Sequence, residues 1–184
     1  MTAIASRSQL RMSFLRYALF TVPAILLLGT VSGRISGSGY GNAWFDALQK
    51  PAFMPPGWVF GVAWTLLYIL LGLALALILH ARGARGRGLA LGLFGLQLVL
   101  NFLWSPIFFA YHEVGAALWT IAAIILISAV TAVLFWRIRR SAGLLMLPYI
   151  AWLCFAAALN WQIGALNPGA AELAPGASTP DIAL

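Results

Sequence analysis

Aromatic and amide side chains recur at helical spacing in three apolar segments of the chain. In one of them Phe60, Trp64 and Tyr68 follow one another at intervals of four residues, which places them on one helix face. The other two segments present comparable faces: Gln97, Asn101, Trp104 and Phe108, and then Trp152, Ala156, Leu159 and Asn160. An aromatic wall with a few convergent amide and phenol groups suits the binding of a flat, mostly apolar ligand with polar edges.

Residues suited to acid–base or metal chemistry are scarce by comparison. Four acids and two histidines occur, and all lie at segment ends, in loops or in the tail: Asp46, Glu113, Glu172, Asp181, His80 and His112. His112 and Glu113 are adjacent, but the second histidine that a zinc-binding helix needs four residues on is missing. The sequence therefore predicts no metal site, and it weighs against an intramembrane proton relay or an ion pore.

The composition indicates whether these helix faces lie in water or in a lipid bilayer. Of 184 residues, 62% are hydrophobic and 8% are charged, and the mean hydropathy is +0.94. A soluble domain carries about 25% charged residues, and a helix needs about 20 apolar residues to cross a bilayer. We therefore predict an all-α integral membrane protein, a bundle of five transmembrane helices at about residues 14–33, 57–79, 89–110, 114–136 and 142–165.

The first of these helices has a competing interpretation. Its charge-free window is 17–33, and it reaches spanning length if Arg16 or Arg34 extends its charge to the interface. Because arginines precede the window, a cleaved signal peptide is the alternative. We favour a retained helix, since no convincing cleavage site precedes a polar mature start.

The positions of the basic residues predict an orientation. Nine of the eleven cations fall on one side of a five-helix topology, and only Arg34 and Lys50 fall on the other. This positive-inside pattern places the N-terminus inside and the C-terminus outside. The basic residues then face anionic lipid heads, and no nucleic-acid partner is expected.

The chain divides into a short polar arm at 1–12, one membrane domain at 13–167 and a tail at 168–184. The tail is rich in Pro, Gly, Ala and Ser, so we expect it to be disordered. The loop 34–56 is long for a compact domain, and such loops are often functional. Because its second half is rich in aromatic residues and proline, we expect an ordered lid. Five spans cannot be halved evenly, which weighs against a typical secondary transporter.

Several of these residues also have a purely structural interpretation. Amides are costly against lipid tails, so Gln97 and Asn101 must point inward, but either can join helices instead of binding a ligand. The GxxxG pairs beginning at Gly57 and Gly88 indicate close helix packing. In the third helix Gly88, Gly92 and Gly95 form one small-residue face, and we expect a homodimer to associate there.

Three stretches in this order resemble the TspO/MBR family. They are "WFDALQKPAFMPPGWVFGVAWTLLY" at 44–68, "LNFLWSPIFF" at 100–109 and "PYIAWLCFAAALNWQIGALN" at 148–167. The family comprises the tryptophan-rich sensory proteins, related to the mitochondrial translocator protein or peripheral-type benzodiazepine receptor. The resemblance covers about residues 17–167, and the combined motifs are highly specific.

The resemblance implies a five-helix bundle, usually dimeric, with a cavity near one membrane face under the first loop. Such proteins bind porphyrins such as protoporphyrin IX, isoquinoline- and benzodiazepine-type drugs and, in some members, cholesterol. Carried over by position, Asp46 and Pro56 hold the lid. The implied pocket is lined by Phe60, Trp64, Tyr68, Asn101, Trp104, Phe108, Trp152, Ala156 and Leu159.

The expected function is therefore that of a tetrapyrrole-binding sensor or carrier that requires no cofactor. Porphyrin propionates would lie at the cavity mouth, near water and Lys50. Two alternatives remain: light- and oxygen-dependent porphyrin degradation involving Trp64 and Trp152, and transport of a porphyrin or sterol. Two departures from the family pattern stand out. Ala52 occupies a loop position that is often tryptophan, and the cholesterol motif at the end of the fifth helix is missing.

Overall fold

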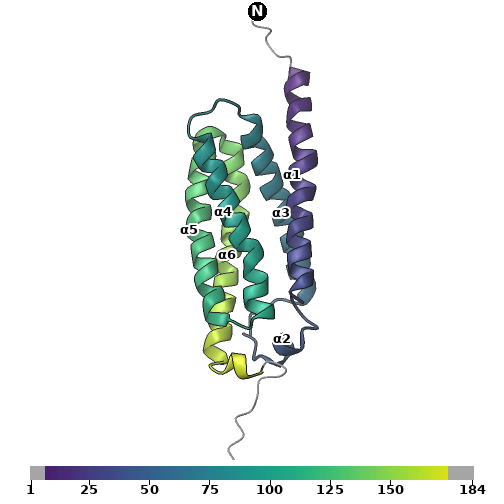
Figure 1. Cartoon of the computed structure of the whole chain (residues 1–184), viewed down its shortest axis with the longest axis vertical. Coiled ribbons are helices and arrows are strands. Elements are labelled where there is room, and N and C mark those ends of the chain that lie inside the picture. The colour runs from purple at the N-terminus through teal and green to yellow at the C-terminus, as the bar shows by residue number, and fades with distance from the viewer. Residues whose placement is uncertain (1–6, 174–184) are drawn as a thin grey trace, which may run out of the picture.

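The computed structural model describes residues 7–173, and within that range every regular element is a helix. Five long helices lie side by side along the length of the molecule, and a short helix lies near one end of the bundle (Figure 1). The elements are α1 (Arg7–Ile35), α2 (Ala43–Ala47), α3 (Gly57–His80), α4 (Arg87–Ser105) with a π-helical continuation (Pro106–Ala110), α5 (Val114–Ile138), α6 (Arg140–Leu166) and a 3₁₀ turn (Ala170–Leu173).

The five predicted spans are confirmed as helices long and apolar enough to cross a membrane. The largest difference in bounds is at the start of α1, which begins at Arg7 instead of near residue 14. Residues 7–12 of the expected polar arm therefore belong to this helix. The segment "RSQLRMS" contains neither glycine nor proline, so nothing in its backbone ends the helix earlier.

The helices pack in the order α1, α3, α6, α5, α4, with α4 returning to α1. Consecutive helices run in opposite directions, and α5 and α6 are separated by Arg139 alone. Gly72 lets α3 approach α1, because a Cβ added there would lie 2.6 Å from the Val22 Cα. Thr21 uses this proximity, since its Oγ1 donates to the Gly72 carbonyl at 2.8 Å. Helices with small residues at the contact can approach in this way without a hydrophobic driving force.

α4 ends in an irregular turn whose cause is Pro106. Proline has no N–H, so the Phe102 carbonyl, one turn earlier, loses its usual helical partner. The Ser32 hydroxyl of α1 donates to this carbonyl at 2.5 Å. The five residues from Pro106 to Ala110 then adopt a π-helix, a feature often found at functional sites.

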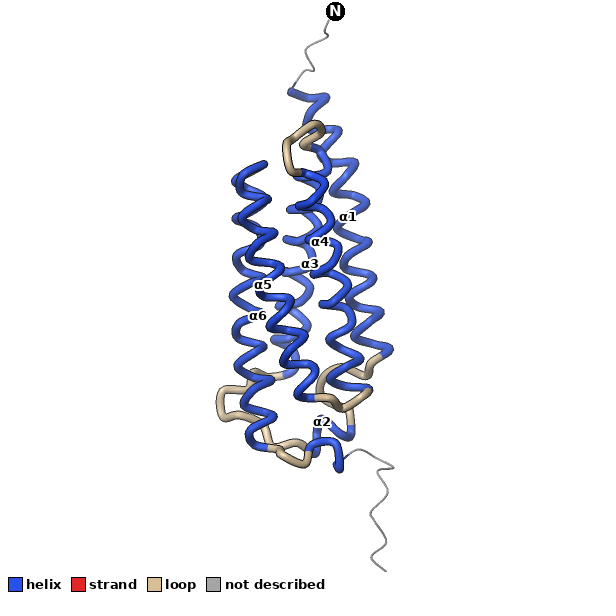
Figure 2. Tube along the Cα trace, turned by 60° about the vertical axis from the view of Figure 1, so that its left-hand side comes forward, coloured by secondary structure: helices blue, strands red, loops and turns tan. Residues whose placement is uncertain are grey.

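The long first loop is ordered, as expected, and packs against one end of the bundle (Figure 2). Its α2 segment lies at the same end as the last described residues of the chain. The expectation of disorder is wrong for the beginning of the tail. Ala170–Leu173 forms a 3₁₀ turn, and Ala170 is buried because Trp44 packs and hydrogen-bonds there. Residues 174–184, the rest of the expected tail, lie outside the described residues.

Candidate ligand-binding site

The centre of the candidate site is a hydrogen bond between two helices. The Tyr68 hydroxyl of α3 donates to Oδ1 of Asn101 on α4 at 3.0 Å, and both side chains are buried. The sequence predicted that both residues lie on inward helix faces. It did not indicate which residue leaves space for the Tyr68 ring. Gly29 of α1 does so, since a Cβ added there would lie 2.8 Å from the Tyr68 hydroxyl oxygen and closer still to the ring.

Aromatic rings of α3 and α6 extend this centre. The Trp64 ring lies 5.3 Å from the Tyr68 ring and 6.5 Å from the ring of Tyr149. One turn before Trp64, Phe60 meets Trp152 edge-on at 5.9 Å. Trp64 and Trp152 are only partly buried, so part of each side chain is not covered by the rest of the protein.

The other four predicted site residues are distributed between this centre and the lid. The Trp104 ring stacks on the Phe108 ring, with 5.1 Å between the ring centroids and 16° between the ring planes. Trp104 packs both against the main hydrophobic core and against the hydrophobic cluster at the lid. Phe108 is buried among lid residues, 5.4 Å from Trp44. Ala156 is half-buried and packs against the main core, and Leu159 is buried. The structure therefore brings most of the predicted set together, with Phe108 lying on the lid side.

Two indole N–H groups at the site have no hydrogen-bond partner among residues 7–173. They are Nε1 of Trp104 and Nε1 of Trp152, and both atoms are buried. Buried polar groups in proteins are nearly always paired, so each exception needs an explanation. Two unpaired donors beside partly covered aromatic faces suit a flat ligand that brings hydrogen-bond acceptors.

Gln97 has the structural role that the alternative interpretation predicted for it. Its Oε1 accepts from the Tyr149 hydroxyl at 2.7 Å and from the Ser128 hydroxyl at 3.3 Å, which joins α4 to α6 and α5. Its Nε2 has no partner within residues 7–173. The sequence analysis did not identify Tyr149 as a site residue. Its position beside Pro148, within the "LPY" motif, is the feature that could have indicated its importance.

The predicted lid residues Asp46 and Pro56 contribute to the shape of the loop itself. Asp46 is exposed, and its Oδ2 accepts from the Gly41 N–H at 3.0 Å. Pro56 is the exposed N-cap residue of α3. Lys50 donates from Nζ to three carbonyl oxygens at 2.8–3.3 Å, those of Phe45, Asp46 and Leu48. An ammonium has three N–H donors, so those of Lys50 are already engaged within the loop.

The lid is fastened to the residues that follow α6 by bonds that the sequence did not predict. Asn167 accepts from the Gln49 N–H at 2.8 Å and donates to the Gln49 carbonyl at 2.9 Å. Trp44 donates from Nε1 to the Ala170 carbonyl at 2.6 Å. We call the surrounding hydrophobic group the lid cluster; it comprises Trp44, Phe45, Leu48, Phe108, Phe109, Ala117, Ile163 and Ala170.

Two further predictions concern metals and oligomers. Among the described residues, no group of three His, Cys, Asp or Glu side chains is placed to hold a metal ion. Gly88, Gly92 and Gly95 lie exposed on α4, and a Cβ added at any of them would meet open space. This small-residue face is exposed in the single chain, and the homodimer stays a prediction.

Comparisons with known proteins identify one family. The profile of the TspO/MBR family matches residues 21–166. Protein CrtK of Rhodobacter capsulatus is 38% identical over 129 residues, which cover 70% of this chain and 81% of that protein. The tryptophan-rich protein TspO of Archaeoglobus fulgidus is 37% identical over 147 residues, covering 80% and 94%. The human translocator protein is 35% identical over 147 residues, covering 77% and 85%.

Proposed function

The chain belongs to the TspO/MBR family, and we propose that this multi-pass membrane protein binds tetrapyrroles of the protoporphyrin IX type and similar flat apolar molecules, as a sensor or carrier. The observation that carries the proposal is a pair of indole N–H donors, on Trp104 and Trp152, that have no partner among residues 7–173 and belong to side chains packed against the cluster that contains Tyr68. The names of relatives, a tryptophan-rich sensory protein in Cereibacter sphaeroides and a translocator protein in humans, support the sensor or carrier role.

Affinity would come mainly from burial and stacking of the macrocycle. Phe60, Trp64 and Trp152 supply aromatic surface from two helices, and aromatic pairs contribute about 0.5–1.5 kcal/mol beyond the area that they bury. Polar edges of the ligand would meet the two indole N–H groups and the Tyr68–Asn101 pair. Because Lys50 is engaged with loop carbonyls, the propionates would remain in water at the mouth of the site.

A fluorescence-quenching titration with protoporphyrin IX tests this proposal. We expect Trp64→Ala to weaken binding about tenfold, because it removes a stacking surface worth about 1.4 kcal/mol, and Tyr68→Phe to weaken it by a smaller factor. Trp119→Ala is the matched control, since Trp119 is 78% exposed on α5, away from the site. Identical titrations for all three variants and the wild type would refute the site.

Light- and oxygen-dependent degradation of the porphyrin is the second candidate activity. It is favoured by the positions of Trp64 and Trp152, which present oxidisable indoles from α3 and α6 beside the same aromatic centre. Illumination of the protein with protoporphyrin IX in air would then produce a bilin-like absorbance, and Trp64→Phe would abolish it. Slow bleaching that is independent of both tryptophans would leave binding as the sole function.

We also propose that two copies associate through α4 and that the arginine-rich end of the bundle faces the cytoplasm. Gly92→Leu would place a bulky side chain on the exposed small-residue face and reduce the dimer fraction in mild detergent. Accessibility of single cysteines at partly exposed Ala84 and exposed Ala171, each introduced with Cys154 replaced by serine, would report the orientation. The loop between α3 and α4 and the turn after α6 lie at opposite ends of the bundle (Figure 1). A reactive position 84 in right-side-out vesicles would contradict it.

A further inference from the structure

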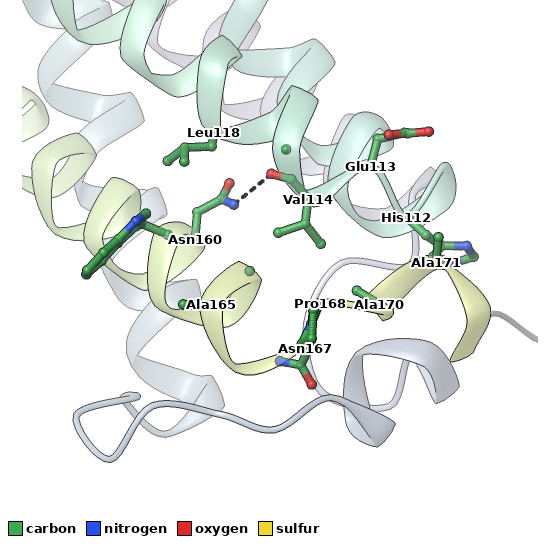
Figure 3. A pocket seen from close by; sticks show the side chains of 13 residues that line it. His112, Glu113, Val114, Leu118, Asn160, Ala165, Asn167, Pro168, Ala170 and Ala171 are labelled. Atoms are coloured by element: carbon green, nitrogen blue, oxygen red, sulfur yellow. Dashed lines mark hydrogen bonds between the residues drawn. The ribbon is translucent and has the colours of Figure 1, made fainter.

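A cavity of about 460 Å³ lies where the beginning of α5 meets the end of α6 (Figure 3). None of the predicted ligand-site residues lines it, so it is separate from the aromatic site. Its walls come from the turn before α5, from the first turns of α5 and from the last turns of α6 with the residues that follow.

The cavity contains a buried amide with one unused group. Asn160 is 2% exposed, and its Nδ2 donates to the Val114 carbonyl at 2.9 Å. Its Oδ1 has no partner among residues 7–173. This bond fixes the orientation of the Asn160 amide. If the amide were flipped, its Oδ1 would face the Val114 carbonyl oxygen, and two acceptors would repel each other. Figure 3 shows the Asn160 side chain reaching from α6 towards Val114 and Leu118 of α5. A buried, unpaired acceptor predicts a hydrogen-bond donor from outside the chain.

The charge around the cavity selects a cationic donor. Glu113 is the acidic residue of the lining; its side chain is exposed and makes no capping bond to α5. No lysine or arginine is among its lining residues, and its histidine, His112, packs its ring 4.5 Å from that of Trp44. An anionic head group would therefore meet a carboxylate and an amide oxygen, whereas an ammonium group would meet acceptors suited to it.

The remaining walls indicate where such a ligand comes from. Val114 and Leu118 are apolar, and a Cβ added at Gly115 would meet open space, whereas Gly164 lies close against Val114. Trp161 lines the cavity and is 62% exposed, near the end of a span, where tryptophan marks the membrane–water interface. The cavity thus combines polar acceptors with an apolar approach from the lipid side.

We propose that this cavity binds the head of an ethanolamine phospholipid. The primary ammonium donates to Asn160 Oδ1 and is balanced by Glu113, while the acyl chains follow the seam between α5 and α6 past Leu118. A choline head has the same charge but no N–H, so it cannot satisfy the amide oxygen. Selectivity for ethanolamine over choline therefore separates this site from general attraction of a cation to Glu113.

Native mass spectrometry of the full chain, titrated in detergent with dioleoyl phosphatidylethanolamine or dioleoyl phosphatidylcholine, tests the proposal. A hydrogen bond to a charged group predicts about tenfold tighter binding of the ethanolamine lipid by the wild type. Glu113→Gln should reduce that preference severalfold. Gly115→Leu should abolish it, because Gly115 lines the cavity and a Cβ there meets open space, which leaves room for a larger side chain to occupy the cavity.

Ala122→Leu is the matched control for the filling variant. Ala122 lies exposed on the same face of α5, two turns beyond Gly115 and outside the cavity lining, so this change should leave lipid selectivity as in the wild type. Protoporphyrin quenching should be unchanged in Gly115→Leu, which keeps this test independent of the aromatic site. Equal affinity for the two lipids in the wild type would overturn the proposal, as would retention of the preference in Gly115→Leu.

Discussion

The lid cluster and the aromatic ligand site are both built around tryptophan, yet they use it in opposite ways. In the lid cluster Trp44 is 1% exposed, packs on Phe108 and donates its N–H to the Ala170 carbonyl. In the aromatic site Trp152 is partly buried and its N–H has no partner among the described residues. In the lid cluster the tryptophan is fully packed and hydrogen-bonded, whereas in the aromatic site the tryptophan is partly uncovered and its N–H has no partner among the described residues.

The difference has an energetic meaning inside a membrane. An unpaired donor in an apolar environment costs about 1–3 kcal/mol relative to a paired one, and lipid tails cannot satisfy it. A cluster such as the lid gains stability from its satisfied groups. A site with unpaired groups gives up stability, and a ligand that supplies acceptors recovers it on binding.

The largest expected effect is that of Trp44→Ala, which should destabilise the lid end. Removing a buried tryptophan costs about 3–5 kcal/mol, because a cavity is left behind, so the melting temperature in detergent should fall strongly. Trp119→Ala, on the exposed face of α5, provides the comparison. Equal melting temperatures for the two variants would show that the lid cluster does not stabilise the fold.

Gly29→Ala should disturb the aromatic site from the opposite side. The added methyl group would overlap the Tyr68 ring, and overpacking of this kind costs about 1–3 kcal/mol. Both the melting temperature and protoporphyrin affinity should decrease. Gly33→Ala, one turn later on α1, is the control, since its Cβ would lie 3.8 Å from the nearest atom, Ser38 Oγ. If both variants bind alike, the placement of Tyr68 does not determine affinity.

Asn167→Ala should weaken the attachment of the lid to the segment that follows α6 without removing hydrophobic surface. The variant loses the two bonds to the Gln49 main chain, worth about 0.5–1.5 kcal/mol each, and hydrogen exchange at residues 45–54 should become faster. Gln49→Ala is an informative control because both bonds go to its backbone and survive. Acceleration of exchange by Gln49→Ala to the same degree would contradict the assigned role of Asn167.

The smallest effects come from a pair of Trp→Phe substitutions, and their direction matters more than their size. Trp44→Phe removes a paired donor and should lower stability by about 1 kcal/mol. Trp152→Phe removes an unpaired one, so stability should stay the same or rise slightly while protoporphyrin affinity falls severalfold. Thermal melts and quenching titrations on both variants separate the two effects. A loss of stability in Trp152→Phe would mean that its N–H is satisfied in the protein.

The periodicity of single helices was readable in advance, but their mutual placement was not. Tyr68 and Asn101 were both predicted to point inward, and they meet. Gln97, on the same face as Asn101, instead meets Tyr149 and Ser128. Phe108 continues that face by count, but the π-helix after Pro106 shifts the register and places it in the lid cluster. Neither the partners nor the shift follows from spacing alone.

The sequence by itself determined the solvent, the five spans and the inward direction of the amide and aromatic faces, because a bilayer excludes charge and unpaired backbone from its interior. Tertiary structure alone decided which inward groups found partners. That outcome depends on how closely the helices approach and at what height they face one another, which Gly29, Gly72 and the turn at Pro106 control. It also decided that Asn160 Oδ1, at the cavity between α5 and α6, has no partner among residues 7–173, since whether a buried group is satisfied depends on its neighbours in space.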